Sequence, residues 1–194
     1  GSNQSLSLEK EKKIHQLAAM PLPEVFNSLR SSEFFDEEEY LNKAIYTAFN
    51  HRSDQAVQFA LGYVRSTQLE KSPTGTQDLY IAKQTLRIFP DQSFESLLDL
   101  YSSGGPKVRR NVIEVLGQMD GGQSIRDLLI DALDDESFCE AIQPESVGDP
   151  LRICDVAYNQ IVIRYKIKNV QRVIGSIHTI DMRNHQIRIL KDIL

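Results

Sequence analysis

Tryptophan is absent from this sequence, cysteine occurs only twice, and no stretch approaches the roughly 20 apolar residues that a membrane-spanning helix needs. The two cysteines, Cys139 and Cys154, are too few for a disulfide framework and lack the spacing of a metal-binding motif. A single disulfide between them is left open, because pairing depends on whether the compartment is oxidising. The low cysteine count thus excludes a small domain that depends on several disulfides.

Motifs that carry catalysis are missing as well. The sequence has no glycine-rich phosphate loop, and its glycine pairs are explained as turns before helices. The four histidines are scattered, and none lies beside a cysteine in the sequence. His178, Asp181 and His185 come closest to a metal-ligand set, but zinc normally takes three or four protein ligands. We therefore expect no catalytic, cofactor-binding or metal-binding residues.

The net charge of −5 is small and unevenly distributed. Residues 1–140 hold 14 basic and 22 acidic side chains, whereas residues 141–194 hold 8 basic and 5 acidic ones. This balance makes a general nucleic-acid binder an unfavoured class. One basic cluster stands out, and its members are Arg164, Lys166, Lys168 and Arg172. The cluster is typical of a solvated edge, with an acidic partner, a lipid headgroup or RNA as alternatives; RNA binding predicts a steep salt dependence.

The strongest helical pattern lies in residues 106–135, which predict two amphipathic helices joined by a glycine turn. Pro106 suits the first turn of a helix, where its missing N–H has no partner to lose. The apolar positions repeat at helical spacing in both halves: Val108, Val112, Val115, Leu116, and then Ile125, Leu128, Leu129, Ala132, Leu133. A lone helix pair cannot bury both stripes, so neighbouring pairs are expected on either side.

Two similar pairs precede this one, in residues 40–65 and 76–101, with Thr76 as the expected cap of the second. Equivalent positions hold small or apolar residues: Ala44, Ala82 and Val112 in the first helices, and Val57, Phe94 and Ile125 in the second. The repeat length is about 30 residues between the last two pairs and longer between the first two. A repeating helix pair of this length predicts an α-solenoid.

The ends of the chain differ from these pairs. Gly1 and Ser2 are typical of a removed tag, so residues 1–4 are assigned to that remnant and a disordered terminus. Residues 5–31 predict a polar N-terminal cap, whose first helix begins at Ser5 or Ser7. Residues 5–194 as a whole are expected to form a single domain.

The closing unit is expected at residues 149–194, after an irregular inserted loop at 136–148. Asp149 and Pro150 predict the start of its first helix, and residues 181–194 predict its second. Between them, residues 163–174 alternate apolar and basic side chains, which predicts an extended strand.

Two segments carry a family resemblance. Residues 105–117 (GPKVRRNVIEVLG) and 149–157 (DPLRICDVA) resemble HEAT-like repeats of the phycobilisome-lyase type, whose usual form is Asp-Pro-x-Val-Arg, small residues and Leu-Gly. Residues 151–157 followed by 182–191 look like the closing unit of bacterial HEAT-repeat proteins. The chain departs from the pattern at Gly104-Gly105, where the repeat often has an acidic residue before the proline.

The pattern and the resemblance together predict an all-α, right-handed α–α superhelix, a HEAT/ARM-like solenoid of about four to five helix pairs. The expected function is a non-enzymatic protein–protein interaction scaffold that binds an unidentified partner on its concave face. The candidate contact residues are the outward positions of the second helices: Glu95, Asp99, Arg126, Ile130 and Asp131.

The alternative function, implied by the resemblance, is an auxiliary subunit of a lyase or cofactor-attachment enzyme. It predicts a pocket that reaches Cys139 or Cys154. The oligomeric state is open. The compartment is open too, with the cytoplasm preferred and a removed signal peptide still allowed.

Overall fold

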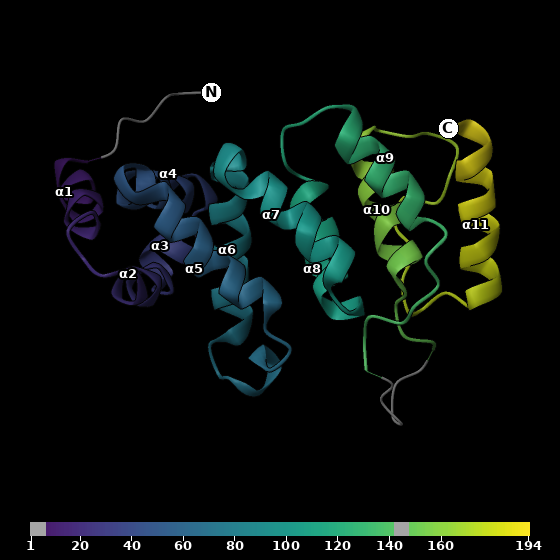
Figure 1. Ribbon diagram of the computed structural model, residues 1–194, viewed down its shortest axis with the longest axis horizontal. Helices are drawn as coiled ribbons and strands as arrows, with labels where there is room; N and C mark the ends of the chain where they lie inside the picture. The colour runs from purple at the N-terminus through teal and green to yellow at the C-terminus, as the bar shows by residue number, and fades with distance from the viewer. Residues whose placement is uncertain (1–6, 142–147) are drawn as a thin grey trace. The chain divides into compact units, whose positions relative to one another are not determined.

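A computed structural model describes residues 7–141 and 148–194, so the predictions for residues 1–4 and for Ser5 lie outside the described residues, as does part of the inserted loop. Every regular element within the described ranges is helical (Figure 1). The α-helices are α1 (Leu8–Leu17), α2 (Leu22–Leu29), α3 (Ser32–Phe35), α4 (Glu38–Phe49), α5 (Ser53–Arg65), α6 (Gly75–Ile88), α7 (Pro90–Ser103), α8 (Pro106–Leu116), α9 (Gln123–Ala132), α10 (Ile153–Arg164) and α11 (Ile180–Ile193). The all-α prediction is therefore confirmed for the described residues.

The chain divides into two compact units, residues 1–95 and 96–194, and the division falls within α7. Unit 1 contains α1 to α6 and the first turns of α7. Unit 2 contains the rest of α7 and α8 to α11.

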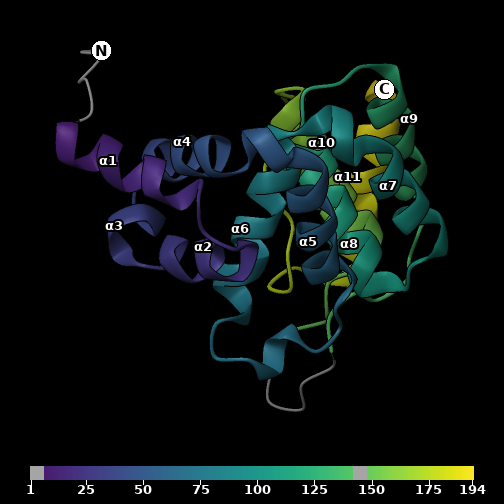
Figure 2. The same ribbon diagram turned by 60° about the vertical axis from the view of Figure 1, so that its left-hand side comes forward.

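Unit 1 is built around α4, which packs against α1, α2, α3 and α6 (Figure 2). Its buried side chains recur at the helical spacing expected from the sequence: Tyr40, Leu41, Ala44, Ile45, Ala48 and Phe49. Helices α4 and α6 run parallel, because two contacts between them follow the same direction along both helices. The side chain of Gln84 donates to that of Asn42 at 3.1 Å, and the rings of Phe89 and Tyr46 stack at 6.0 Å.

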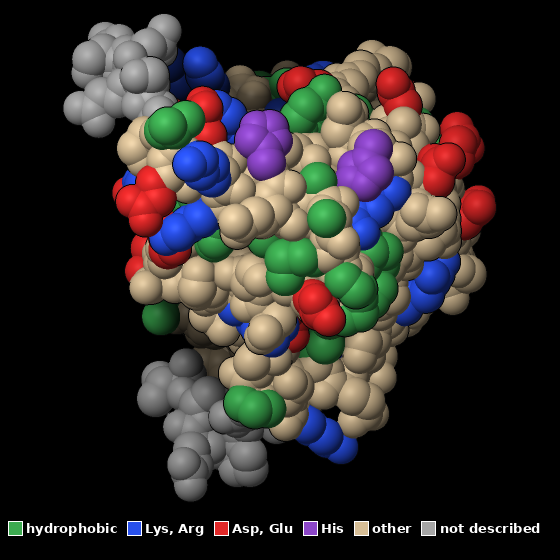
Figure 3. All heavy atoms as spheres, turned by 90° about the vertical axis from the view of Figure 1, so that its left-hand side faces the viewer, with side chains coloured by type: hydrophobic (Ala, Val, Ile, Leu, Met, Phe, Trp, Pro, Cys, Tyr) green, Lys and Arg blue, Asp and Glu red, His purple; other side chains and the backbone are tan. Residues whose placement is uncertain are grey.

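Aromatic side chains join α2 to α5 in unit 1. The ring of Phe26 stacks on that of Tyr63 at 5.2 Å and meets the edge of Phe59 at 5.1 Å. Beside these rings the surface has an open hollow of about 320 Å³ lined by Gln58, Phe59, Gly62 and Tyr63. The face on which the N-terminal helices lie, seen in Figure 3, gathers hydrophobic side chains near its centre, with charged side chains and histidines around them.

Unit 2 is built around α10, which packs against α8, α9 and α11 (Figure 1). Helix α10 is buried on most sides, as expected for a helix that is apolar nearly all round. Helix α11 runs parallel to α10, because Arg183 contacts Asp155 and Gln186 contacts Tyr158 three residues further along both helices. A parallel pair requires a connection that returns along the helix, and residues 165–179 form this crossover segment.

The strand predicted within residues 163–174 is wrong. Ile163 lies in the last turn of α10, and the crossover segment that follows is irregular, with left-handed backbone at Lys166 (φ 51°) and Asn169 (φ 67°). Side chains of α10 take the place of a partner strand. Asn159 donates to the carbonyl of Ile174 at 2.8 Å and accepts its N–H at 2.9 Å.

The predicted helix start at Asp149 and Pro150 is also wrong, because α10 begins at Ile153. The residues before it are held extended by an isolated antiparallel bridge between Phe138 and Arg152. In this bridge the N–H of Cys139 donates to the carbonyl of Leu151 at 2.9 Å. Pro150, two residues before the N-cap Arg152, therefore lies in this extended segment and not in the first turn of the helix.

Other helix starts can be compared with the sequence. Ser7 caps α1 by accepting the N–H of Lys10 at 3.3 Å, and Pro106 lies in the first turn of α8, as predicted. Thr76 is not a cap: α6 begins at Gly75 after Thr74, whose hydroxyl donates to Asp78 at 2.8 Å.

Two glycines of unit 1 provide a matched test of packing. A Cβ on Gly75 would lie 1.9 Å from the backbone oxygen of Leu69, whereas a Cβ on Gly62 would meet nothing within 4 Å. We expect Gly75→Ala to lower the free energy of unfolding by about 1–3 kcal/mol, because the backbone at Leu69 must move to make room for the added methyl group. Gly62→Ala, within α5, should raise it by about 0.5–1 kcal/mol. Chemical denaturation followed by circular dichroism measures both, and equal shifts for the two variants would contradict this packing.

Candidate functional site

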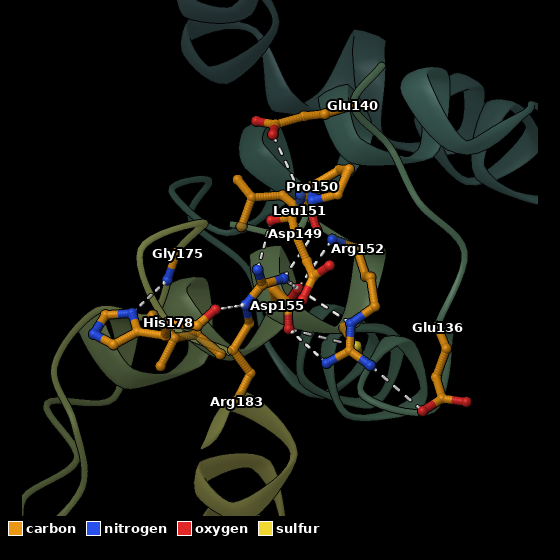
Figure 4. A network of polar contacts seen from close by, with 12 residues as sticks. Glu136, Glu140, Asp149, Pro150, Leu151, Arg152, Asp155, Gly175, His178 and Arg183 are labelled. Carbon is orange, nitrogen blue, oxygen red and sulfur yellow. Dashed lines mark hydrogen bonds and ion pairs between the residues drawn. The ribbon is translucent and has the colours of Figure 1, made fainter. Parts of the chain in front are cut away.

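A buried carboxylate lies between two arginines at the start of α10 (Figure 4). Asp155 and Arg183 are fully buried, and Arg152 is nearly so. The carboxylate of Asp155 accepts from Nη1 of Arg183 at 2.7 Å and from Nε and Nη2 of Arg152 at 3.2 and 3.0 Å. It also accepts the backbone N–H of Arg152 at 3.0 Å, so one side chain both caps α10 and neutralises its neighbours.

Arg183 ties α11 to the segments around it. Its Nη2 donates to the carbonyl of Asp149 at 2.6 Å, and its Nη1 donates to that of Pro150 at 2.9 Å. Its Nε donates to the carbonyl of His178 at 3.0 Å, at the end of the crossover segment. A buried charge is tolerated when it is paired and hydrogen-bonded, and Arg183 meets both conditions with groups of the protein itself.

Arg152 is held in the same way. Its Nη2 also donates to the side chain of Asn184 at 2.8 Å, and its Nη1 lies 3.5 Å from the exposed carboxylate of Glu136. Burial acts to lower the pKa of Arg152, but the hydrogen bond and charge of Asp155 outweigh it, and this pKa is raised. The arginine–carboxylate network thus has a structural role, because its polar atoms are occupied by one another and by backbone.

The two cysteines are buried and unpaired in this structure, so the disulfide left open by the sequence is not formed here. Burial raises the pKa of Cys139 to about 11 and that of Cys154 to about 12. Because the thiolate is the nucleophilic form, neither thiol is prepared for covalent chemistry near neutral pH.

The histidine pair considered as a metal site is not gathered into one. Nδ1 of His178 accepts the N–H of Gly175 at 3.0 Å within the crossover segment, whereas His185 lies exposed on α11. Among the described residues, no group of three or more His, Cys, Asp or Glu side chains is placed to hold a metal ion.

Arg164, counted in the basic cluster, is used inside unit 2. Its Nη1 donates to the carbonyls of Met119 at 2.7 Å and Gly117 at 3.1 Å, and its Nη2 donates to that of Gly121 at 3.0 Å. These contacts cap the C-terminal end of α8, where carbonyls lack helical partners. Because α10 ends where α8 ends, the two helices run parallel.

The candidate residues on α9 lie on two parts of its surface. Arg126 is half-buried, with its guanidinium 5.2 Å from the centre of the Tyr165 ring. Ile130 is half-buried, and Asp131 is exposed. The Asp131 side chain makes no hydrogen bond or ion pair with any residue that the structure describes, so its charge faces solvent.

Asp131 belongs to a longer acidic face. Asp127 precedes it by four residues and Asp134 follows it by three, and both are exposed. Asp127 accepts a hydrogen bond from Gln123 at 2.7 Å, and Asp134 pairs with Lys191 of α11. We call Asp127 and Asp131 of α9, together with Asp134 in the turn that follows the helix, the acidic face of α9.

Glu95 and Asp99, the remaining candidates, lie one turn apart on α7, and both are exposed. Asp99 belongs to unit 2. Near it on α7, burial raises the pKa of Tyr101; the charges of Asp135 and Asp131 add to this effect, and that of Arg109 opposes it. Glu95 belongs to unit 1. The structure therefore places Asp99 in the same unit as the acidic face, and it assigns Glu95 to the other unit.

Asp127, Asp134, Asp155 and Arg183 were not among the candidate residues predicted from the sequence. Asp127 follows from Asp131 by the spacing of neighbours on a helix, so a signal for it was present. Asp134 lies in the turn after α9, where helical spacing no longer applies. Asp155 was signalled more weakly, as the one acidic residue in a mostly apolar helix.

Comparison of the chain with protein-family models, curated proteins and solved structures finds no match. Over the described residues, none of the helices has the length and apolar character to cross a membrane.

The arginine–carboxylate network predicts a large effect from a single atom exchange. Asp155→Asn removes the one buried counter-ion of two buried guanidinium groups, and we expect it to lower the free energy of unfolding by about 3–5 kcal/mol. Glu136→Gln removes an exposed partner of Arg152 and should change it by less than about 0.5 kcal/mol. Urea titration measures both values. Similar stabilities for wild type and Asp155→Asn would show that the network does not hold unit 2 together.

Proposed function

We propose that this chain is a non-enzymatic protein-interaction module built from HEAT-like helix pairs, and that it binds a partner with a basic contact surface through the acidic face of α9. The acidic face itself carries the proposal. Asp127 and Asp131 lie one turn apart on α9, and Asp134 lies in the turn that follows it. All three are exposed, and Asp131 has no hydrogen-bond or ion-pair partner among the described residues. Complementary charge of this kind favours the approach and orientation of an oppositely charged protein.

The composition of the surrounding surface supports this choice. Ile130 lies next to Asp131 and is half-buried, so an apolar contact is available beside the charges. The positive charge of Arg126 is directed onto the Tyr165 ring. The predicted role of Arg126 in contacting the partner is thus replaced, in this proposal, by a role in supporting α9.

The directions of the helices support the repeat part of the proposal. Helices α4 and α6 are parallel in unit 1, and α8 and α10 are parallel in unit 2, as first helices of successive repeats are in a stack. Ala44, Ala82 and Val112, which the sequence aligns, are all fully buried. The right-handed superhelix and the concave binding face stay predictions.

Helix α11 differs from the second helix of a repeat. Second helices run antiparallel to the first, whereas α11 runs parallel to α10. In this proposal α11 covers the side of α10 that a further repeat would otherwise cover, which is the role of a terminal unit.

The alternative, an auxiliary subunit of a cofactor-attachment enzyme, is less well supported. Attachment to cysteine requires an accessible thiolate, but Cys139 and Cys154 are buried and have raised pKa values.

The proposal is tested by affinity capture from lysate of the source organism, with proteins quantified by mass spectrometry. We expect the wild-type chain to retain a discrete partner that Asp127→Lys/Asp131→Lys loses by at least about tenfold, because both substitutions oppose a basic surface. The matched control is Asp36→Lys/Glu39→Lys, which changes two exposed acids of unit 1 and gives the same net charge. Equal recovery by all three proteins would contradict a partner site on α9.

A further inference from the structure

The crossover segment, residues 165–179, presents positive charge that no acidic side chain among the described residues of unit 2 pairs with. The sequence contains no acidic residue between Asp155 and Asp181. Lys166, Lys168 and Arg172 are exposed, and none of the three forms an ion pair with the residues that the structure describes. Three cations are therefore free to interact with an external anion.

Apolar side chains stand out from the same segment. Ile177 is 87% exposed and Val173 is 47% exposed, whereas Ile174 between them is buried against α10. Asn159 of α10 fixes the backbone at Ile174 from below, so the neighbouring side chains are directed outward by the fold. Covering an aliphatic side chain as exposed as Ile177 removes apolar area from water, which favours contact with another surface.

Helix α11 extends this apolar surface. Met182, Gln186, Ile189 and Ile193 follow one another at i, i+4, i+7 and i+11 and so share one stripe of the helix. Gln186 accepts the backbone N–H of Gln171 at 3.0 Å, which places this stripe along the crossover segment. Met182 and Ile193 are 40% and 49% exposed.

The acidic residues of α11 lie to the side of this stripe. Asp181 and Asp192 share the neighbouring stripe with His185 and Arg188. The stripe that borders the crossover segment is thus apolar, and the segment beside it is basic.

We propose that the crossover segment and the adjoining stripe of α11 form a surface through which unit 2 docks on an anionic lipid bilayer. Lysine and arginine side chains near a bilayer are attracted to anionic headgroups, and apolar side chains gain from burial at the boundary between headgroups and acyl chains. The surface supplies both together.

Other occupants fit less well. In a symmetric pairing with a second copy, Lys166, Lys168 and Arg172 would face the same cations of the partner chain, and like charges repel. An acidic protein would satisfy the cations, but it would need a matching recess for Ile177. A bilayer adapts its surface to a protruding side chain and needs no such recess.

The test is co-sedimentation of the whole chain with vesicles made of phosphatidylserine and phosphatidylcholine in equal amounts, or of phosphatidylcholine alone. We expect binding to the anionic vesicles only. Lys166→Glu/Lys168→Glu/Arg172→Glu should lower the partition coefficient by roughly 100-fold, since each cation near the bilayer surface raises this coefficient severalfold. Ile177→Ser should lower it by about tenfold by removing the apolar contact.

The matched control is Lys12→Glu/Arg65→Glu/Lys71→Glu, which gives the same net charge from three exposed cations of unit 1. It should keep at least half of the wild-type binding, and circular dichroism verifies that every variant is folded. Equal loss in the control, or binding retained by the crossover variant, would overturn the proposal. Failure of the wild type to bind anionic vesicles would also overturn it. Binding to polyglutamate would then favour an acidic protein as the occupant, and dimer formation would favour a second copy of the chain.

Discussion

One carboxylate between two arginines determines how the second unit is assembled. Asp155 caps α10, accepts from Arg152 beside it, and accepts from Arg183 of α11, all in the protein interior. The alternative arrangement of α11, antiparallel to α10, would carry Arg183 away from its counter-ion and leave a buried charge unpaired, which is strongly destabilising. The network therefore favours a parallel pair, and a parallel pair requires the crossover segment.

The crossover segment in turn separates the charges of unit 2. The acidic face lies on α9 and the turn that follows it. Lys166, Lys168 and Arg172, which form no ion pair with a described residue, lie on the connection that returns along α10. Arg164 contributes to neither surface, because it caps α8. Two oppositely charged surfaces on one small unit suit a protein that joins two partners, here proposed to be a basic protein and an anionic bilayer. Each surface has its own test, so either proposal can fail without the other.

Local rules of helix formation account for what the sequence predicted well. The buried stripe of α4, the glycine turn between α8 and α9, and the first turn at Pro106 all follow from spacing and backbone preference. The errors arose where tertiary contacts override these rules. Alternating residues 163–174 are not a strand, because α10 supplies their hydrogen bonds, and α10 starts late because Arg152 is bridged to Phe138. Of the candidate residues, Asp131 and Ile130 fit the proposed face, whereas Arg126 is turned toward Tyr165.

The claim that Arg183 fixes α11 and the crossover segment is tested most directly by hydrogen–deuterium exchange, read by mass spectrometry on wild type and Arg183→Met. If the account is correct, exchange accelerates in residues 165–193, because the substitution releases the bonds to Asp149, Pro150, Asp155 and His178. Helices α4 to α6 in unit 1 should exchange as in wild type. Unchanged protection of α11 in the variant would contradict the account.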